Sequence, residues 1–483
     1  MDRVEKEKEN SPKSLSKPRK TIMQVLGSLG PGLITGASDD DPSGIATYSQ
    51  AGAKFGFGML WMVLFQYPMM IVVQEMCARI GLVTGGGLAA VIRKKYSGKI
   101  VLPIVSVLLF ANTINIGADI GAMAASIRLI FPGFPPIAAT LAFAVFIIAA
   151  EIFIPYRKYS KVLRYLTLSL FAYIITAVIV GGNWIQIATA SFVPHIEFNS
   201  QFAMMFVAIF GTTISPYLFF WQASEEAEED VAKHKIKEVS GTGSATKSID
   251  RTESNNSHGT TRNNEHESDV DNQNNNISKK PKISKTELML MRSDVAIGMG
   301  FSLSIMWAII VTTAGSLHVN GITDIQTADQ AAKALQPLAK SFPYAGEMAK
   351  TIFALGIIGS GLITVPVLAG SSGYALSDVF GWKEGLSKKF RQAKGFYLII
   401  AASTLVGLWI NFANIDPIRA LVYTAVINGI IAAPILYIIM RAANDKNILG
   451  NKVNGRISNI IGWLTFTMMS VSVVIMFLTW RGG

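Results

Sequence analysis

Runs of about 20 apolar residues recur along this chain, and they constrain its fold more than any other feature. Each run can cross a bilayer as a helix, because a helix rises about 1.5 Å per residue and the hydrocarbon core is about 30 Å thick. Half of the 483 residues are hydrophobic and only 16% are charged, which is too little charge to cover a soluble protein of this length. The sequence therefore predicts an all-α polytopic membrane protein.

The apolar runs predict eleven transmembrane helices. They lie at about 21–52, 58–80, 100–130, 136–155, 162–182, 201–222, 294–316, 348–372, 395–412, 417–440 and 457–480. Lys and Arg gather in every second loop, whereas the loops at 131–135 and 183–200 contain neither. Because cytoplasmic loops carry the excess of Lys and Arg, we expect a cytoplasmic N-terminus and an extracellular C-terminus, in a multi-pass protein of the plasma membrane.

Two polar segments stand apart from the apolar runs. Residues 1–20 are basic and are expected to form a cytoplasmic tail. Residues 240–285 are rich in Asn, Ser, Thr and Gly, and they cannot bury enough apolar surface to offset their ordering entropy. We expect this stretch to be a disordered cytoplasmic loop within one transmembrane transporter domain, residues 21–482.

The net charge of +11 could suggest a nucleic-acid partner. Here the basic residues belong to short loops between apolar runs, so we expect a lipid bilayer around the chain and no nucleic acid. The single cysteine, Cys77, can form no disulfide within the chain and no metal site on its own. No sequence feature requires a second copy, and a monomer is the simplest expectation.

Two of the apolar runs are interrupted by proline. The first run breaks at residues 41–44 and the sixth at 212–216. Each break falls in the first helix of a five-helix unit, 21–182 or 201–440, and paired interruptions of this kind point to a transporter built from two inverted repeats. The eleventh helix, 457–480, is then an addition outside the repeats.

The first break carries a carboxylate, which costs roughly 3 kcal/mol or more near the bilayer centre unless it has a positive partner. Proline also frees backbone carbonyls, which are tolerated there only when they line a cavity or are buried. A cation held by Asp41, by carbonyls around Ser38 and Thr212, and by the Ser215 hydroxyl would satisfy all these groups. Such a site has only oxygen ligands, which suit Mg²⁺, Ca²⁺ or Mn²⁺. The alternative is that the two prolines merely kink their helices.

Four further acids are candidates for the ion pathway. Asp39 and Asp40 either are wetted by an aqueous vestibule or concentrate cations, for example by holding a second hydrated ion. Asp119 lies inside the third run, where an acid is a functional candidate unless it simply bonds a neighbouring helix. Glu225 lies roughly 15 Å along the helix from Pro216, either at a solvated helix end or in an acidic inner vestibule.

Three segments resemble the Nramp family of divalent-metal transporters, and a fourth does so more loosely. They are GPGLITGASDDDPSGIATYSQAGAKFGFGMLW at 30–61, CARIGLVTGGGLAAVIRKKY at 77–96, GADIGAMAASIRLI at 117–130 and, loosely, GSGLITVPVLAGSSGYALSDVF at 359–380. The resemblance implies a LeuT-like fold with two inverted five-helix repeats. It also implies alternating-access transport of a divalent cation as substrate, with no enzymatic activity and no cofactor.

The chain departs from the family at the metal ligands. Asp41 matches the family's Asp-Pro-Gly-Asn motif, but Gly44 stands at its Asn position, and Ser215 stands where the sixth span of the family has Met. The thioether that favours softer metals is therefore gone, and the small residues leave room for an ion that keeps its waters, as Mg²⁺ does. A divergent branch of the family that moves Mg²⁺ is similar in this respect. Mg²⁺ is thus favoured as the substrate, with Mn²⁺ as the second candidate.

The chain also departs from the residues of the family's proton route. Tyr217 replaces the sixth-span His, and the third-span Asp119 is followed by Ala122 where the family has a second acid. The paired arginines of the ninth span have no counterpart in 395–412. These departures predict transport without strong proton coupling.

Two other functions fit the same pattern. On the same fold, the two breaks could hold an organic solute such as an amino acid together with Na⁺, although three consecutive acids disfavour a carboxylate there. A membrane sensor could bind ions without moving them, with the loop at 240–285 contacting partners. An intramembrane aspartyl protease is disfavoured, because no second aspartate occurs in a matching motif.

Overall fold

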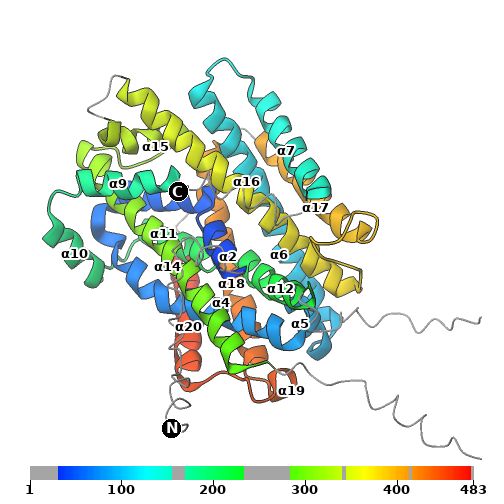
Figure 1. Cartoon of the computed structure of the whole chain (residues 1–483). Helices are drawn as coiled ribbons and strands as arrows, with labels where there is room; N and C mark the ends of the chain where they lie inside the picture. The colour runs from blue at the N-terminus through cyan, green and yellow to red at the C-terminus, as the bar shows by residue number, and fades with distance from the viewer. Residues whose placement is uncertain (1–30, 155–168, 233–282, 340–343, 413–415, 480–483) are drawn as a thin grey trace, which may run out of the picture.

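The computed structural model describes residues 31–154, 169–232, 283–339, 344–412 and 416–479, and these residues form helices and turns without any strand (Figure 1). The expected all-α class is therefore confirmed. The proposed tail at 1–20 and nearly all of the loop at 240–285 lie outside the described residues, so both stay predictions.

The longest helices lie side by side in one bundle, and shorter helices connect them (Figure 1). In chain order the α-helices are α2 (Pro31–Asp39), α3 (Pro42–Phe55), α4 (Trp61–Thr84), α5 (Leu88–Lys95), α6 (Gly98–Ile130), α7 (Pro136–Phe153), α9 (Phe171–Val180), α10 (Trp184–Phe192), α11 (Ser200–Thr213), α12 (Pro216–Ala232), α14 (Lys285–Ser316), α15 (Ala328–Ala332), α16 (Ala345–Phe380), α17 (Lys394–Gly407), α18 (Pro417–Ala443), α19 (Lys446–Leu449) and α20 (Arg456–Thr479). The 3₁₀ helices are η1 (Gly56–Met59), η3 (His318–Asn320), η4 (Lys333–Ala339) and η5 (Leu408–Phe412).

Eight helices among the described residues are long and apolar enough to cross a membrane. Two bent pairs bring the number to ten: Pro42–Met59 with Trp61–Thr84, at 107°, and α9 with α10, at 120°. The sequence predicts eleven spans because α3 and α4 count as two. The segment from Gly56 to Leu60 is a turn that joins two spans and not a kink within one span. Helix α10 was not foreseen, since its nine residues are too few to read as a span; Asn183 caps it by accepting from the Gln186 amide.

Both proline breaks are present. The first lies slightly earlier than expected: α2 ends at Asp39 and α3 begins at Pro42. Proline is well tolerated as the first residue of a helix, because its missing N–H would have no helical partner there. The second break separates α11, which ends at Thr213, from α12, which begins at Pro216.

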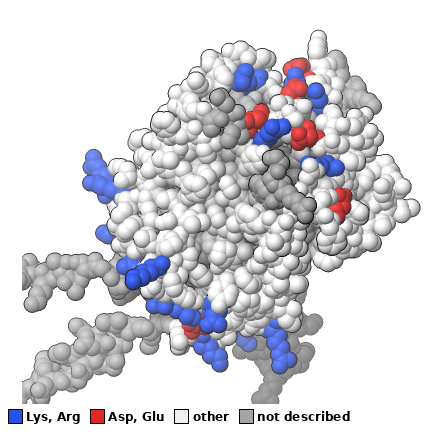
Figure 2. All heavy atoms as spheres, turned by 180° about the vertical axis from the view of Figure 1, so that it is seen from behind, with Lys and Arg blue, Asp and Glu red and all other residues white. Residues whose placement is uncertain are grey.

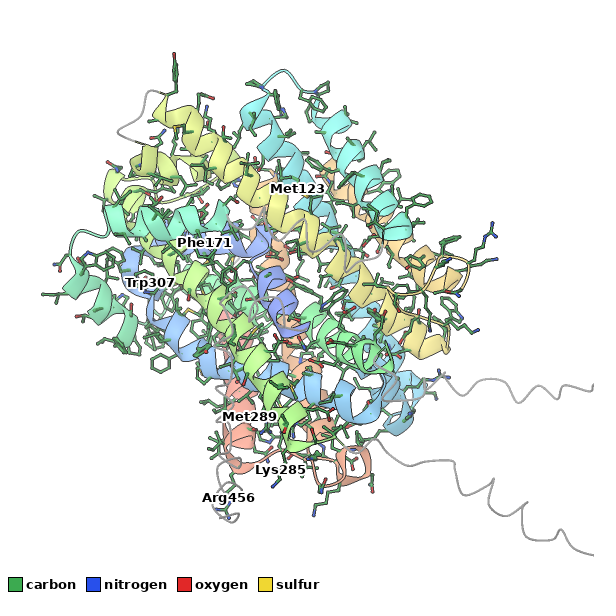
Figure 3. The ribbon with its side chains drawn as sticks, viewed as in Figure 1. Met123, Phe171, Lys285, Met289, Trp307 and Arg456 are labelled. Carbon is green, nitrogen blue, oxygen red and sulfur yellow. The ribbon has the colours of Figure 1, made fainter. Side chains whose placement is uncertain are left out.

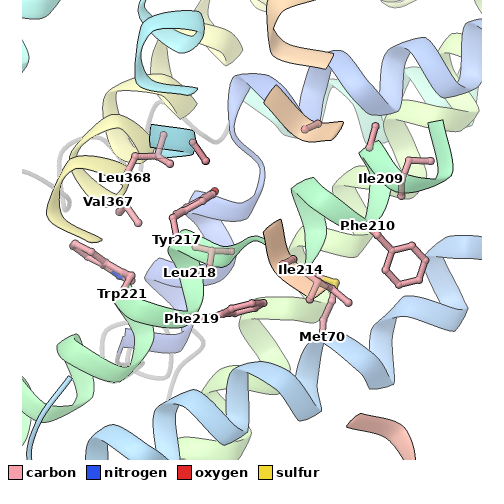
Figure 4. Packing of buried hydrophobic residues seen from close by; sticks show 14 of the residues in the cluster. Met70, Ile209, Phe210, Ile214, Tyr217, Leu218, Phe219, Trp221, Val367 and Leu368 are labelled. Atoms are coloured by element: carbon pink, nitrogen blue, oxygen red, sulfur yellow. The ribbon is translucent and has the colours of Figure 1, made fainter. Parts of the chain in front are cut away.

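Glycines let the broken helices approach their neighbours closely. A Cβ on Gly36 of α2 would lie 2.3 Å from the Gly298 carbonyl oxygen of α14, and one on Gly211 of α11 would lie 2.3 Å from the Gly429 amide nitrogen of α18. Backbone contact through small residues is typical of helices packed within a membrane. The breaks are therefore enclosed by α14 and α18, and buried apolar residues such as Leu218 and Leu368 fill the space beside them (Figure 4).

The outer surface agrees with a bilayer-spanning bundle. Phe110, Val145, Leu398 and other large apolar side chains are exposed on the long helices. Figure 2 shows charged side chains gathered toward two ends of one face, with a broad uncharged zone between them. Side chains cover the outside of the bundle all round, with Phe171 on α9 and Met289 on α14 among those that are exposed (Figure 3).

Candidate functional site

The first break holds the carboxylate of Asp41 at the start of α3. Asp41 is the N-cap residue, and its side chain accepts from the Gly44 amide. The Ser43 hydroxyl donates to the same carboxylate, at 2.8 and 2.9 Å from its two oxygens, and the Asn115 amide reaches it from α6 at 3.4 Å. The positive end of the α3 dipole also faces this carboxylate, so the break is built to hold negative charge.

The second break carries no acid and closes on its own backbone. The Ser215 hydroxyl donates to the carbonyls of Gly211 and Thr212, at 2.7 and 2.6 Å. One of the carbonyls expected as an ion ligand, that of Thr212, is therefore engaged within α11 in this structure.

The Ser38 carbonyl is also engaged. It accepts from the Tyr217 hydroxyl at 3.0 Å and from the Thr364 hydroxyl of α16 at 3.2 Å. Tyr217 thus ties the start of α12 to the end of α2, at the position where the family has His. To bind an ion, Ser38 would have to exchange one of these donors for the ion.

The two breaks meet at Gly44. The Thr212 hydroxyl lies 3.5 Å from Asp41 Oδ1. A Cβ built on Gly44 would lie 3.2 Å from three oxygens: the Asp39 carbonyl, Asp41 Oδ1 and Thr212 Oγ1. A larger residue would press on these oxygens, so glycine is what allows them to converge. Asp41, Thr212, Ser38 and Ser215 are all buried.

Asp39 and Asp40 face α14 and are fully buried rather than wetted. The Ser302 hydroxyl lies 2.5 Å from Asp39 Oδ2 and 3.2 Å from Asp40 Oδ1, and donates to them. Within the described residues, Asp39 Oδ1 and Asp40 Oδ2 have no donor. The acid triplet is therefore divided: Asp41 faces the second break, whereas its two neighbours share one hydroxyl on α14.

Asp119 lies on α6, one turn beyond Asn115, and is buried. Neither of its carboxylate oxygens has a hydrogen-bond donor among the residues that the structure describes. It therefore does not simply bond a neighbouring helix, which was one of the two interpretations of the sequence. Its neighbour Asn115 is the α6 residue that reaches Asp41.

Several polar contacts of the site were missed from the sequence. Ser43 follows the motif directly, and an intramembrane amide such as Asn115 could have been included on the same grounds as Asp119. Ser302 and Thr364 offered no local signal, because isolated hydroxyls are common in apolar helices. In the described part of the chain, no group of three or more His, Cys, Asp and Glu is placed to hold a metal, so any ion here would depend on hydroxyl and backbone oxygens as well as Asp41.

The site is closed toward the end where α2 begins. The Gly32 amide donates to Asp294 of α14 at 2.7 Å, and the Thr35 hydroxyl donates to Gln222 of α12. Glu225, one turn further along this side of α12, accepts from Tyr374 of α16 at 3.3 Å and is partly buried. The first two contacts hold α2 against α14 and α12, and the third holds α12 against α16.

A smaller set of polar contacts closes the opposite end. Gln50 of α3 donates to Asp324 at 3.0 Å and accepts from the Ile325 amide at 2.8 Å, and Arg419 of α18 lies 3.7 Å from Asp324. A cavity of about 310 Å³ lies beside these residues, lined also by Lys54. This end is therefore hollowed, whereas the α2 end is packed.

Comparison with known proteins places the chain among relatives. A sequence model described as natural resistance-associated macrophage protein-like, or Nramp, matches residues 32–479. The chain belongs to the Nramp family. Two relatives from strains of Klebsiella pneumoniae, each named divalent metal cation transporter MntH, are 24% and 25% identical to it. The alignments cover 91% of this chain in both cases, and 91% and 90% of the relatives.

Solved structures with similar folds lead to the same fold class. A crystal structure of the Eremococcus coleocola manganese transporter, in complex with an aromatic bis-isothiourea substituted compound, has a TM-score of 0.66 at 16% identity, covering 94% of this chain and 86% of that one. Mhp1, a nucleobase-cation-symport-1 family transporter, has a TM-score of 0.51 at 12% identity, covering 94% and 93%. The LeuT-like fold expected from the sequence is confirmed, and the Nramp family consists of transporters rather than enzymes. The residue limits of the two repeats stay predictions.

Proposed function

We propose that this chain carries a divalent metal cation across the plasma membrane by alternating access, with Mg²⁺ as the preferred substrate and Mn²⁺ as the second candidate. Its N-terminus would lie in the cytoplasm. The observation that carries the proposal is the buried Asp41 carboxylate, held between the two helix breaks beside Gly44 and Thr212. The relatives named as divalent metal cation and manganese transporters support transport of a divalent ion.

The preference for Mg²⁺ rests on the ligands around Asp41. Ser215 and Gly44 replace the family's Met and Asn, so the available ligands are all oxygens. Hard ions such as Mg²⁺ favour oxygen ligands and keep several waters, whereas a thioether favours softer transition metals. The names of the relatives favour Mn²⁺, which also accepts oxygen ligands, and this makes Mn²⁺ the alternative to be tested.

Weak proton coupling is the second part of the proposal. Tyr217 uses its hydroxyl to donate to the Ser38 carbonyl, so at this position the chain has a structural donor where the family has a titratable His. Asp119 is a lone acid, with Ala122 one turn further along α6. A relay of protons needs a chain of groups that exchange them, and here only Asp119 remains of those that the resemblance implies.

Alternating access requires the buried site to open at each end in turn. At one end, α2 would have to leave Asp294 and Gln222, and at the other, Gln50 would have to leave Asp324. Each set consists of a few hydrogen bonds, and a bound ion could help one set to break while the other stays formed. A closed state with both sets formed is the form that this structure represents.

Ion flux into proteoliposomes, with internal pH recorded, tests the proposal. Vesicles with the purified protein receive Mg²⁺ or Mn²⁺ outside, and uptake is compared with vesicles that contain Asp41→Ala and with vesicles that contain Asp329→Asn, which alters a half-exposed acid outside the site. We expect Mg²⁺ entry without acidification in the wild type and in Asp329→Asn, and no entry in Asp41→Ala.

Other outcomes would overturn one part or all of this proposal. Mn²⁺ entry with acidification and no Mg²⁺ entry would refute both the Mg²⁺ preference and weak coupling. Uptake of neither ion by folded protein would refute ion transport. In that case competition by amino acids would support an organic substrate, and ion binding without flux would support a sensor.

A further inference from the structure

A second pocket, far from the helix breaks, lies where α5, the end of α18 and the start of α20 meet. It has a volume of about 570 Å³. Its lining combines three basic side chains with two amides and one aromatic ring: Lys95, Arg441, Lys446, Asn444, Asn459 and Trp463. No step of the proposed transport uses this pocket, so its composition calls for its own explanation.

The charges in the pocket are not balanced. Lys95 is paired with Asp445, with 2.5 Å between Nζ and Oδ2. Arg441 and Lys446 are exposed, and neither forms an ion pair with any residue that the structure describes. Three cations and one anion leave an excess of two positive charges in the lining. A pocket of this kind attracts an anion, and a phosphate is the form that matches several donors at once.

The pocket is held in shape by hydrogen bonds rather than by loose side chains. The Asn444 amide donates to Asn459 at 2.7 Å, which ties the end of α18 to the start of α20. Asn454 donates to the same Asn459 oxygen at 3.2 Å. Asp445 accepts from the Asn447 amide at 2.8 Å as well as from Lys95. The polar wall beside Arg441 and Lys446 is therefore fixed before any ligand arrives, which lowers the entropic cost of binding.

The other wall of the pocket is aromatic and belongs to the membrane-facing zone. Trp463 lies two turns, or roughly 10 Å, along α20 from Arg456. Its ring contacts Tyr437 of α18 and Phe466 of α20, with centroids 5.9 and 5.7 Å apart. Trp and Tyr are enriched where a bilayer meets water. The pocket thus combines cations from α5, α18 and α19 with an aromatic ring suited to the boundary between head groups and acyl chains.

The position of the pocket in the molecule fits the same interpretation. Figure 1 places α19 next to α5 at one end of the bundle, and Figure 3 shows Arg456 at that end. Lys and Arg outnumber Asp and Glu along this lower edge in Figure 2. By the charge rule this is the cytoplasmic side, where basic pockets between transmembrane helices bind anionic lipid head groups.

We propose that this pocket binds the head group of an anionic phospholipid, whose phosphate contacts Arg441 and Lys446 and whose glycerol and acyl chains lie against Trp463. A soluble phosphate would use the same cations but would leave the aromatic wall uncovered. The lipid would fasten the end of α18 to α20 and α5. This site is independent of the proposed ion substrate, because it shares no residue with the helix breaks.

Native mass spectrometry of the full-length protein in detergent tests the proposal. Delipidated protein receives phosphatidylglycerol or phosphatidylcholine, and retained lipid is counted for the wild type, the double variant Arg441→Gln/Lys446→Gln, and the control Lys389→Gln/Arg391→Gln. The control removes the same charge from an exposed loop, 381–393. We expect retained phosphatidylglycerol in wild type and control, and about 30-fold weaker binding in the double variant, since each basic residue near a membrane contributes about a factor of five.

Two further arms make the outcome decisive. Phosphatidylglycerol should raise the melting temperature of the wild type and the control but not that of the double variant, which also verifies that the variant is folded. Inorganic phosphate and glycerol 3-phosphate should not displace the lipid. Equal retention by the double variant, equal retention of phosphatidylcholine, or displacement by inorganic phosphate would each overturn the assignment of a lipid site.

Discussion

The two helix breaks are related by position in the chain but differ in chemistry. The first, between α2 and α3, holds three consecutive acids, and its Asp41 caps the helix that follows. The second, between α11 and α12, holds none, and its Ser215 hydroxyl satisfies carbonyls of its own helix. One break therefore supplies charge, and the other supplies neutral oxygens and space.

This difference indicates how an ion-binding site can be divided between two repeats. A buried carboxylate helps to offset the dehydration of a divalent cation, but a second charged break would add carboxylates that repel one another when the ion has left. A neutral second break avoids that cost, because its carbonyls can return to internal hydrogen bonds. In this structure the Ser215 hydroxyl occupies those carbonyls, whereas the Tyr217 hydroxyl donates to the Ser38 carbonyl at the first break.

The largest expected effect comes from replacing one polar side chain at the first break, and it is compared with the same kind of replacement at the second. Asp41→Asn should lower the rate of divalent-cation uptake by about 100-fold or more, because it removes the negative charge held between the two breaks. Ser215→Ala should change uptake by less than about threefold, because its hydrogen bonds are internal and each contributes only modestly. Uptake into proteoliposomes at equal protein content measures both. Comparable losses in the two variants would show that the breaks contribute equally.

A tenfold change in the ratio of Mn²⁺ to Mg²⁺ uptake is expected when the two ligand residues typical of the family are restored. The pair Gly44→Asn/Ser215→Met restores the residues typical of the family and should raise uptake of Mn²⁺ relative to Mg²⁺ by about tenfold, because a thioether favours the softer ion. The Asn side chain must displace the oxygens that lie 3.2 Å from the Gly44 Cβ position by a few tenths of an ångström.

The control for this pair is Gly44→Ala, which adds the same Cβ without the amide. It should lower uptake of both ions to a similar extent and leave their ratio unchanged. If Gly44→Ala alone shifted the ratio toward Mn²⁺, the selectivity would come from the volume of the site rather than from its ligands.

The sequence predicted the breaks better than it predicted their contacts. A proline and an acid in an apolar run have local consequences, so Asp41 and the break between α11 and α12 could be placed from the chain alone, whereas α12 runs on to Ala232, beyond the expected end at 222. The contact of Ser302 with Asp39 joins residues 263 positions apart, and it depends on how α2 packs against α14. The hydroxyl of Ser215 has two uses, as ligand or as internal donor, and only the packed structure shows which one it adopts in the closed form.

A smaller effect is expected at the shared hydroxyl on α14. Ser302→Ala removes the donor to Asp39 and Asp40, and an unsatisfied buried group costs about 1–3 kcal/mol. We expect a melting temperature several degrees lower in detergent. The control Ser304→Ala removes an exposed hydroxyl on the same helix that donates only to the Gly300 carbonyl, and it should leave the melting temperature unchanged. Equal melting of both variants would mean that the two acids do not depend on Ser302.

The smallest effect concerns the acid Glu384, which lies in the segment between α16 and α17. Burial raises the pKa of Glu384 well above its usual range, and the adjacent Asp378 and Glu228 raise it further, while Lys388 opposes them. The folded protein therefore keeps this proton at pH values where the unfolded chain, with a glutamate pKa of about 4.3, has lost it. Stability must fall as pH rises above about 4.3, because the folded state then binds more protons than the unfolded state.

Glu384→Gln removes this dependence. At pH 4 the variant and the wild type should have the same melting temperature. As the pH rises toward 8, the melting temperature of the variant should exceed that of the wild type by a growing amount. Thermal melting in detergent across this range measures the difference. The control Glu347→Gln alters an exposed acid that lies 3.6 Å from Lys350, and an exposed pair of this kind contributes little at any pH. If the advantage of Glu384→Gln did not grow with pH, folding would not raise the pKa of Glu384.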